Sequence, residues 1–139
     1  MGKVFRQSSR ESKILSRIES NREYQRRQAQ QQIPHCLDAL ANALSQKLVE
    51  NHLVETTSKN SLEEEFRAVL DKLSRADDFD IDYQISPVRR LVPNPNVISL
   101  YLTAWVVEKL LNHKDVVDIF GDDLDIYTCI QQQVARFLP

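Results

Sequence analysis

Glycine occurs only twice in the 139 residues of this chain, as Gly2 and Gly121. Tight turns, and loops that cradle phosphate groups, use backbone conformations that glycine adopts most easily. So few glycines argue against a barrel or sandwich with many tight turns, and against a phosphate-binding loop. The hydrophobic fraction of 42% and the charged fraction of 27% are ordinary for a folded protein. At this length we expect one domain with a single core.

Apolar residues recur at three- and four-residue spacing in four segments, which predicts four core helices. The first runs from about residue 34 to residue 53. The second begins at Ser61, which is followed three residues later by glutamate in the pattern of a capping box. Asn94 and Pro95 provide a cap and a first-turn proline for the third helix, and Asp122 caps the last.

Two connecting segments have other patterns. Residues 78–85 alternate strictly between apolar and polar side chains, which predicts a short extended segment. Residues 113–121 are expected to form a short helical turn that ends at glycine. Trp105 should be buried in the third helix, because its neighbours at helical spacing are also apolar. We therefore expect a mainly α protein: a compact bundle of about four helices, with a basic, partly helical amino-terminal arm and one short extended segment.

Residues 1–32 form the expected arm, and residues 33–139 form the expected helical domain. The arm consists mostly of Arg, Glu, Gln and Ser, and its main apolar cluster lies within residues 14–18. This cluster is too short for a coiled coil, which needs apolar positions over about three or four heptads. We expect an exposed or frayed helix that orders on contact with a partner, then a linker over residues 28–32 and a boundary at Pro34.

Charge divides the chain at the same place. Residues 1–30 contain eight Lys or Arg and three Glu, a formal charge of +5, whereas residues 31–139 contain ten basic and seventeen acidic residues, a formal charge of −7. This polarity predicts either an anionic partner for the arm or a contact between arm and body, including one between neighbouring molecules. The candidate partner-binding residues are the basic side chains of the arm: Arg6, Arg10, Lys13, Arg17, Arg22, Arg26 and Arg27.

The sequence contains no complete metal-binding or catalytic motif. The acidic stretch that begins at Asp78 has the early spacing of a helix-loop-helix calcium site, but Tyr83 stands where glycine is needed and Arg89 where glutamate is needed. The Cys and His residues lack the close spacing of a structural zinc site. We therefore expect no catalytic residue, no metal and no cofactor.

Cys36 and Cys129 are the only cysteines and lie far apart in the chain, unlike the disulfide framework of a small secreted protein. We expect both to pack as small apolar residues in a reducing, cytoplasmic location. No segment approaches the roughly 18 uninterrupted apolar residues of a membrane span, so we expect no membrane partner.

These features favour a non-enzymatic interaction or assembly protein that docks through the basic arm and helix faces onto a protein partner or another copy of itself. The alternative is a nucleic-acid-associated protein whose arginine-rich arm contacts phosphates, with Tyr24 to stack on bases. A small enzyme of unknown reaction is the third hypothesis, although no nucleophile or base stands out from the sequence.

Overall fold

The computed structural model describes the backbone of residues 9–139, and within residues 9–22 it describes the side chains of Lys13 and Arg17 only. The described chain contains five α-helices, two short 3-10 helices and one two-stranded sheet. In chain order these are α2 (Ser9–Glu50), β1 (Val54–Thr56), α3 (Lys59–Ser74), α4 (Asp78–Ile85), η1 (Ser86–Val88), α5 (Val97–Glu108), η2 (Leu110–Asn112), β2 (Val116–Ile119) and α6 (Asp123–Phe137). The expected class, mainly α and compact, is confirmed. Within residues 9–139 no helix is both long and apolar enough to cross a membrane.

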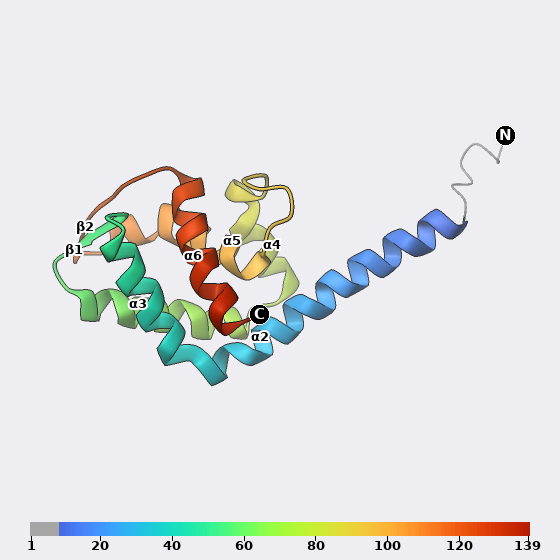
Figure 1. Ribbon diagram of the computed structural model, residues 1–139, viewed down its shortest axis with the longest axis horizontal. Helices are drawn as coiled ribbons and strands as arrows, with labels where there is room; N and C mark the ends of the chain where they lie inside the picture. Colours follow the sequence, from blue (N-terminus) through green and yellow to red (C-terminus); the bar gives the residue numbers. More distant parts are fainter. Residues whose placement is uncertain (1–8) are drawn as a thin grey trace.

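Helix α2 joins the expected arm to the first core helix as one kinked element. Its backbone departs from helical geometry at Cys36 (φ −126°, ψ 16°), two residues after Pro34. Proline lacks the N–H that completes the helical hydrogen-bond ladder, and so accounts for a kink nearby. The linker expected over residues 28–32 is wrong: these residues are helical, because glutamine and alanine are good helix formers. Figure 1 shows the amino-terminal part of α2 projecting beyond the rest of the molecule.

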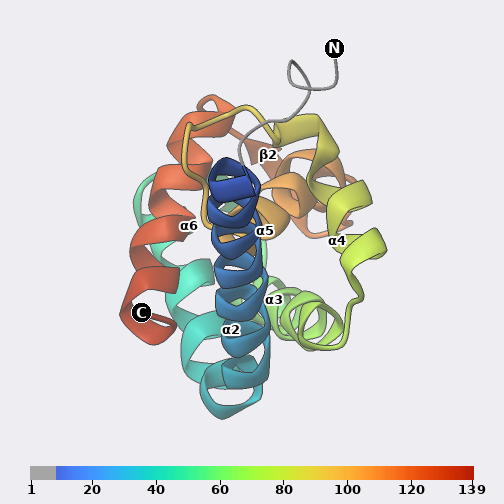
Figure 2. The same cartoon turned by 90° about the vertical axis from the view of Figure 1, so that its right-hand side faces the viewer.

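The body is built around α5, in which every residue from Ile98 to Val106 is buried. Helix α2 packs against α3 and α6, and α5 packs against α4 and α6; Figure 2 shows these helices grouped behind the projecting end of α2. Trp105 is 9% exposed, and its ring meets the ring of Phe66 edge to face with 5.0 Å between centroids. The burial expected for Trp105 is confirmed.

A small antiparallel sheet closes one end of the body. Strands β1 and β2 pair with Val54 opposite Ile119. The helical turn expected over residues 113–121 is therefore wrong, because β2 is rich in β-branched side chains and finds a partner strand in β1. Gly121 follows the strand with φ +82°, and a Cβ atom at this position would lie 2.9 Å from the side chain of Leu53. Glycine suits this bend on both counts.

Helix α4 occupies the segment that we expected to be extended, so that expectation is wrong. Ile81 and Ile85, four residues apart, are buried, whereas Phe79 and Tyr83, also four residues apart, are each 76% exposed. Strict alternation over eight residues contains two such pairs, and therefore fits a short helix as well as a strand. Asp77 favours the helix because its side chain caps the first turn.

Two helices begin at residues other than those expected. Ser58 rather than Ser61 caps α3, and its hydroxyl oxygen accepts a hydrogen bond from the Ser61 backbone N–H at 3.1 Å. Asn96 rather than Asn94 caps α5. In both cases two residues of the same type lie within three positions of each other, and both are good capping residues. Residue type alone therefore does not tell which of the two caps the helix. The cap expected at Asp122 is confirmed, and it forms a reciprocal capping box at the start of α6.

Candidate interaction surface

The basic arm meets the acidic body at the start of α4. The guanidinium of Arg26, whose side chain is only 12% exposed, donates a hydrogen bond to the carboxylate of Asp78. Arg27 Nη2 lies 3.9 Å from the second carboxylate oxygen of Asp78. Asp78 is the first residue of α4, where a carboxylate also interacts favourably with the helix dipole. The structure thus places two of the seven candidate residues in a contact between arm and body.

Gln30 forms a second contact between α2 and the body. Its side chain is buried, and its amide nitrogen donates to the backbone carbonyls of Leu73, at 2.9 Å, and Ala76, at 3.0 Å. These carbonyls lie at the end of α3, where that of Leu73 also accepts a hydrogen bond from the Ala76 backbone N–H at 3.1 Å. Ile33, one turn later in α2, is fully buried. The packing of α2 against the body therefore begins before the proline.

Beyond this contact the arm offers cationic side chains to solvent. Lys13 and Arg17 are exposed and lie one helical turn apart on α2, and Tyr24 is 63% exposed. Figure 1 shows this part of the helix leading away from the body. Arg10 and Arg22 belong to α2, but their side chains lie outside the described set, and Arg6 lies outside the described residues altogether. Lys13 and Arg17 are therefore the candidates that the structure shows directly on the projecting helix.

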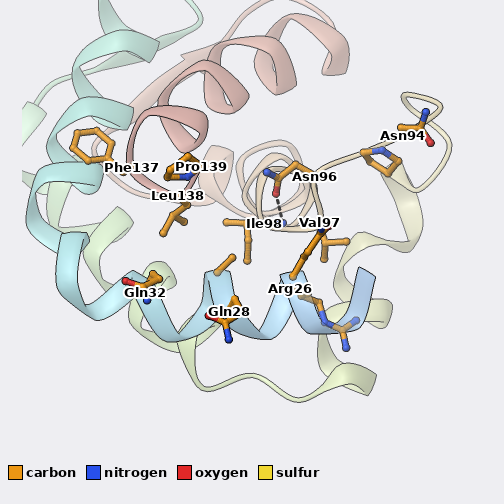
Figure 3. A pocket seen from close by; sticks show the side chains of 13 residues that line it. Arg26, Gln28, Gln32, Asn94, Asn96, Val97, Ile98, Phe137, Leu138 and Pro139 are labelled. Carbon is orange, nitrogen blue, oxygen red and sulfur yellow. Dashed lines mark hydrogen bonds between the residues drawn. The ribbon is translucent and has the colours of Figure 1, made fainter. Parts of the chain in front are cut away.

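A groove of about 840 Å³ flanks the base of the arm (Figure 3). Its walls come from α2, from the residues that lead into α5, and from the end of α6. They comprise Gln25, Arg26, Gln28, Ala29, Gln32, Asn94, Pro95, Asn96, Val97, Ile98, Phe137, Leu138 and Pro139. Among these side chains only that of Arg26 is ionisable, so the groove offers no acid–base pair for catalysis. No sequence pattern signals this groove, because its walls come from three distant segments.

The two thiols are poorly suited to nucleophilic chemistry. Burial raises the pKa of the Cys129 thiol, and the nearby Asn51 amide, 3.4 Å from the sulfur, only partly offsets this effect. Burial also raises the pKa of Cys36. A raised pKa favours the neutral thiol, whereas nucleophiles and metal ligands are thiolates. Within residues 9–139, as far as their side chains are described, no three His, Cys, Asp or Glu residues gather in a metal-binding arrangement.

Comparison of the chain with protein-family models, with curated proteins and with solved structures found no match. Function is therefore inferred from the surface of the molecule and its charges.

Proposed function

We propose that the protein is a non-enzymatic interaction or assembly protein that docks through its basic amino-terminal helix. The observation that carries this proposal is the projection of α2 beyond the body, with the cations of Lys13 and Arg17 exposed on it. The body has the opposite sign of charge, and one of the contacts between the two parts already joins Arg26 to a carboxylate. An acidic protein surface is the partner that this chemistry favours.

The energetics of a projecting helix support the same proposal. Most of the stability of a protein helix comes from packing one face against other elements, and an isolated helix is marginal in water. The part of α2 before Glu23 gains no such support from the contacts at Arg26 and Gln30, which lie further along the helix. A partner surface that packs against this part would add such support, so binding and ordering of the helix would strengthen each other.

Nucleic acid is the second candidate, because the same exposed features suit it. Lys13 and Arg17 can neutralise phosphates, and the ring of Tyr24 is 63% exposed and free to stack on a base. Phosphate binding releases counterions, so its affinity would fall steeply and log-linearly with added salt. A nuclease-treated sample separates the two candidates, since capture through nucleic acid is lost after digestion.

The proposal is tested by reversing charge at two places with equal change in net charge. The arm variant carries Lys13→Glu and Arg17→Glu, and the matched control carries Lys59→Glu and Lys114→Glu on exposed body positions. Arg26 is left intact because it contacts Asp78. Each tagged protein is incubated with native lysate, with and without nuclease, and the captured proteins are compared at low and physiological salt.

The control should capture the same proteins as the parent, and the arm variant should lose them. The parent should also capture less of these proteins as the salt concentration rises, because exposed charges are screened over about 8 Å at physiological ionic strength. An arm variant that captures the same nuclease-resistant proteins as the parent would show that docking does not use this helix. Capture that depends wholly on intact nucleic acid would favour the second candidate.

A further inference from the structure

Helix α4 presents an aromatic face to solvent. Phe79 and Tyr83 are each 76% exposed and lie four residues apart, on the side of α4 opposite the buried Ile81 and Ile85. Large aromatic side chains gain much of their stabilising effect from burial, so two of them exposed one turn apart are unusual on a monomer. Single exposed apolar residues are ordinary, whereas an adjacent pair can mark an interaction site.

Carboxylates flank this aromatic pair. At 100° per residue, Asp82 falls on one side of Phe79 and Tyr83 and Asp80 on the other, and both carboxylates are exposed. Arg89 Nη2 is 3.9 Å from Asp82 Oδ1, beyond hydrogen-bonding distance, so this carboxylate can still accept. We use the term α4 face for these four residues. Aromatic rings bordered by carboxylates suit a partner that carries cations.

We propose that the α4 face binds the projecting part of α2 from a second copy of this chain. This inference rests on the proposed function of α2, and names its partner. The charges are complementary, because the α4 face carries two carboxylates and the arm carries Lys13 and Arg17. The same pairing already occurs inside one molecule, where Arg26 of α2 contacts Asp78 at the start of α4.

The spacing of the two surfaces also matches. Lys13 and Arg17 are four residues apart on one helix, and Phe79 and Tyr83 are four residues apart on the other. Such pairs lie about 6 Å apart along their helix axes. Two helices side by side can therefore place each cation over one ring, within the roughly 6 Å at which a cation and an aromatic ring attract each other.

A molecule cannot make this contact with its own arm. Helix α2 is continuous through Arg26, which already contacts the first residue of α4. Arg17 lies nine residues earlier and Lys13 thirteen, which at 1.5 Å per residue places them about 13 Å and 20 Å further along the axis. Figure 1 shows α2 leading away from the body over this stretch. The occupant of the α4 face must therefore come from another molecule.

The assembly that follows is head to tail. Each copy offers one arm and one α4 face, which are different surfaces, so the contact is heterologous and forms a closed ring or an open chain. Blocking the arm of one copy and the α4 face of another should leave a single productive contact between them. This property supplies a sharp test.

The test uses sedimentation velocity on the full chain at low salt over a range of concentrations. The arm variant carries Lys13→Glu and Arg17→Glu, and the face variant carries Phe79→Ser and Tyr83→Ser. A control replaces two exposed apolar residues elsewhere, Val117→Ser and Leu124→Ser. All of these side chains are exposed, and a thermal melt of each variant checks that it remains folded.

The parent and the control should self-associate, and each of the other two variants should associate about tenfold or more weakly. An equimolar mixture of the arm and face variants should form a one-to-one heterodimer, because the intact arm of one meets the intact α4 face of the other. A parent that stays monomeric, a face variant that associates like the parent, or a mixture that stays monomeric would overturn the inference.

The two proposals can fail separately. If the parent stays monomeric while the arm variant still loses captured proteins from lysate, docking through α2 stands and the partner is not a second copy. If the arm variant both captures those proteins and self-associates like the parent, the proposed function and this inference both fail.

Discussion

Gln30 joins the arm to the body through hydrogen bonds from its side-chain amide to the end of α3. It belongs to a glutamine-rich run that indicates a linker, yet its side chain is buried and donates to the carbonyls of Leu73 and Ala76. Those acceptors lie more than forty residues later in the chain. No local pattern distinguishes Gln30 from the exposed Gln31 beside it, because the distinction depends on where α3 ends in space.

Replacing Gln30 with leucine should destabilise the protein by about 1–3 kcal/mol, the usual cost of leaving buried polar groups without partners. The change nearly preserves side-chain volume but removes both donors to the end of α3. Gln31→Leu, on an exposed position of the same helix, is the matched control and should fall within about 0.5 kcal/mol of the parent. Urea denaturation measures both, and equal free energies of unfolding for the two variants would refute the role of Gln30.

Because of Cys129, the free energy of unfolding should depend on pH in the alkaline range. Burial raises the pKa of its thiol in the folded protein above the unfolded value. The contribution of Cys129 to the free energy of unfolding is therefore fully present below the unfolded pKa of about 8.5. It is lost as pH rises through the pKa of the folded protein. Under reducing conditions the free energy of unfolding should decline above about pH 8.5, and less steeply in Cys129→Ala. Parallel declines in the two proteins would contradict this assignment.

Among the elements, the amphipathic helices were the most predictable from sequence. The apolar stripes placed the main helices of the body, and the highly apolar segment around Trp105 indicated a helix surrounded by others, as α5 is. The short elements were not predictable. The alternation of apolar and polar residues in α4 fits a short helix as well as a strand. The segment of β2 is a strand because β1, some sixty residues earlier, pairs with it. Pairing between distant segments leaves little trace in a short sequence window.

The cap of α6 gives a test at this scale. Asp122 accepts a hydrogen bond from the backbone N–H of Asp125 at 2.9 Å, and the carboxylate of Asp125 accepts one from the N–H of Asp122 at 3.1 Å. Asp122→Ala should destabilise the protein by about 1 kcal/mol. Asp123→Ala removes the same charge from the same turn but no capping bond, and should cost less. If urea denaturation shows that both variants lose the same free energy of unfolding, the effect is due to charge alone.

At the scale of the whole molecule, the division of charge in the sequence separates a basic arm from an acidic body. It placed the candidate cations on the arm, and the structure shows Lys13 and Arg17 exposed on α2 and Arg26 in contact with the acidic body. It did not predict how far α2 packs against the body, because a helix of Gln, Arg and Glu shows no apolar stripe at Gln30. The exposed aromatic pair of α4 was also missed, since an extended segment with strict alternation would place Phe79 and Tyr83 on the same side as Ile81 and Ile85, which are buried.

Truncation should separate the part of α2 that stabilises the fold from the part that binds. Residues 25–139 keep the Arg26 contact with Asp78 and the Gln30 contacts with α3, so this fragment should melt cooperatively near the temperature of the parent. Residues 33–139 lack both contacts, and should be less stable by about 1–3 kcal/mol. Calorimetry on the two fragments measures the difference, and a fragment 25–139 that fails to fold would place the projecting helix in the core.

Docking through the arm is tested most directly by comparing the binding of partner proteins by residues 25–139 with that by the full chain. Both proteins carry the same body, groove and α4 face, and differ only in the projecting part of the arm. In capture from nuclease-treated lysate at low salt, the full chain should retain partner proteins and residues 25–139 should lose them. Capture of the same proteins in the same amounts by both would rule out docking through the arm.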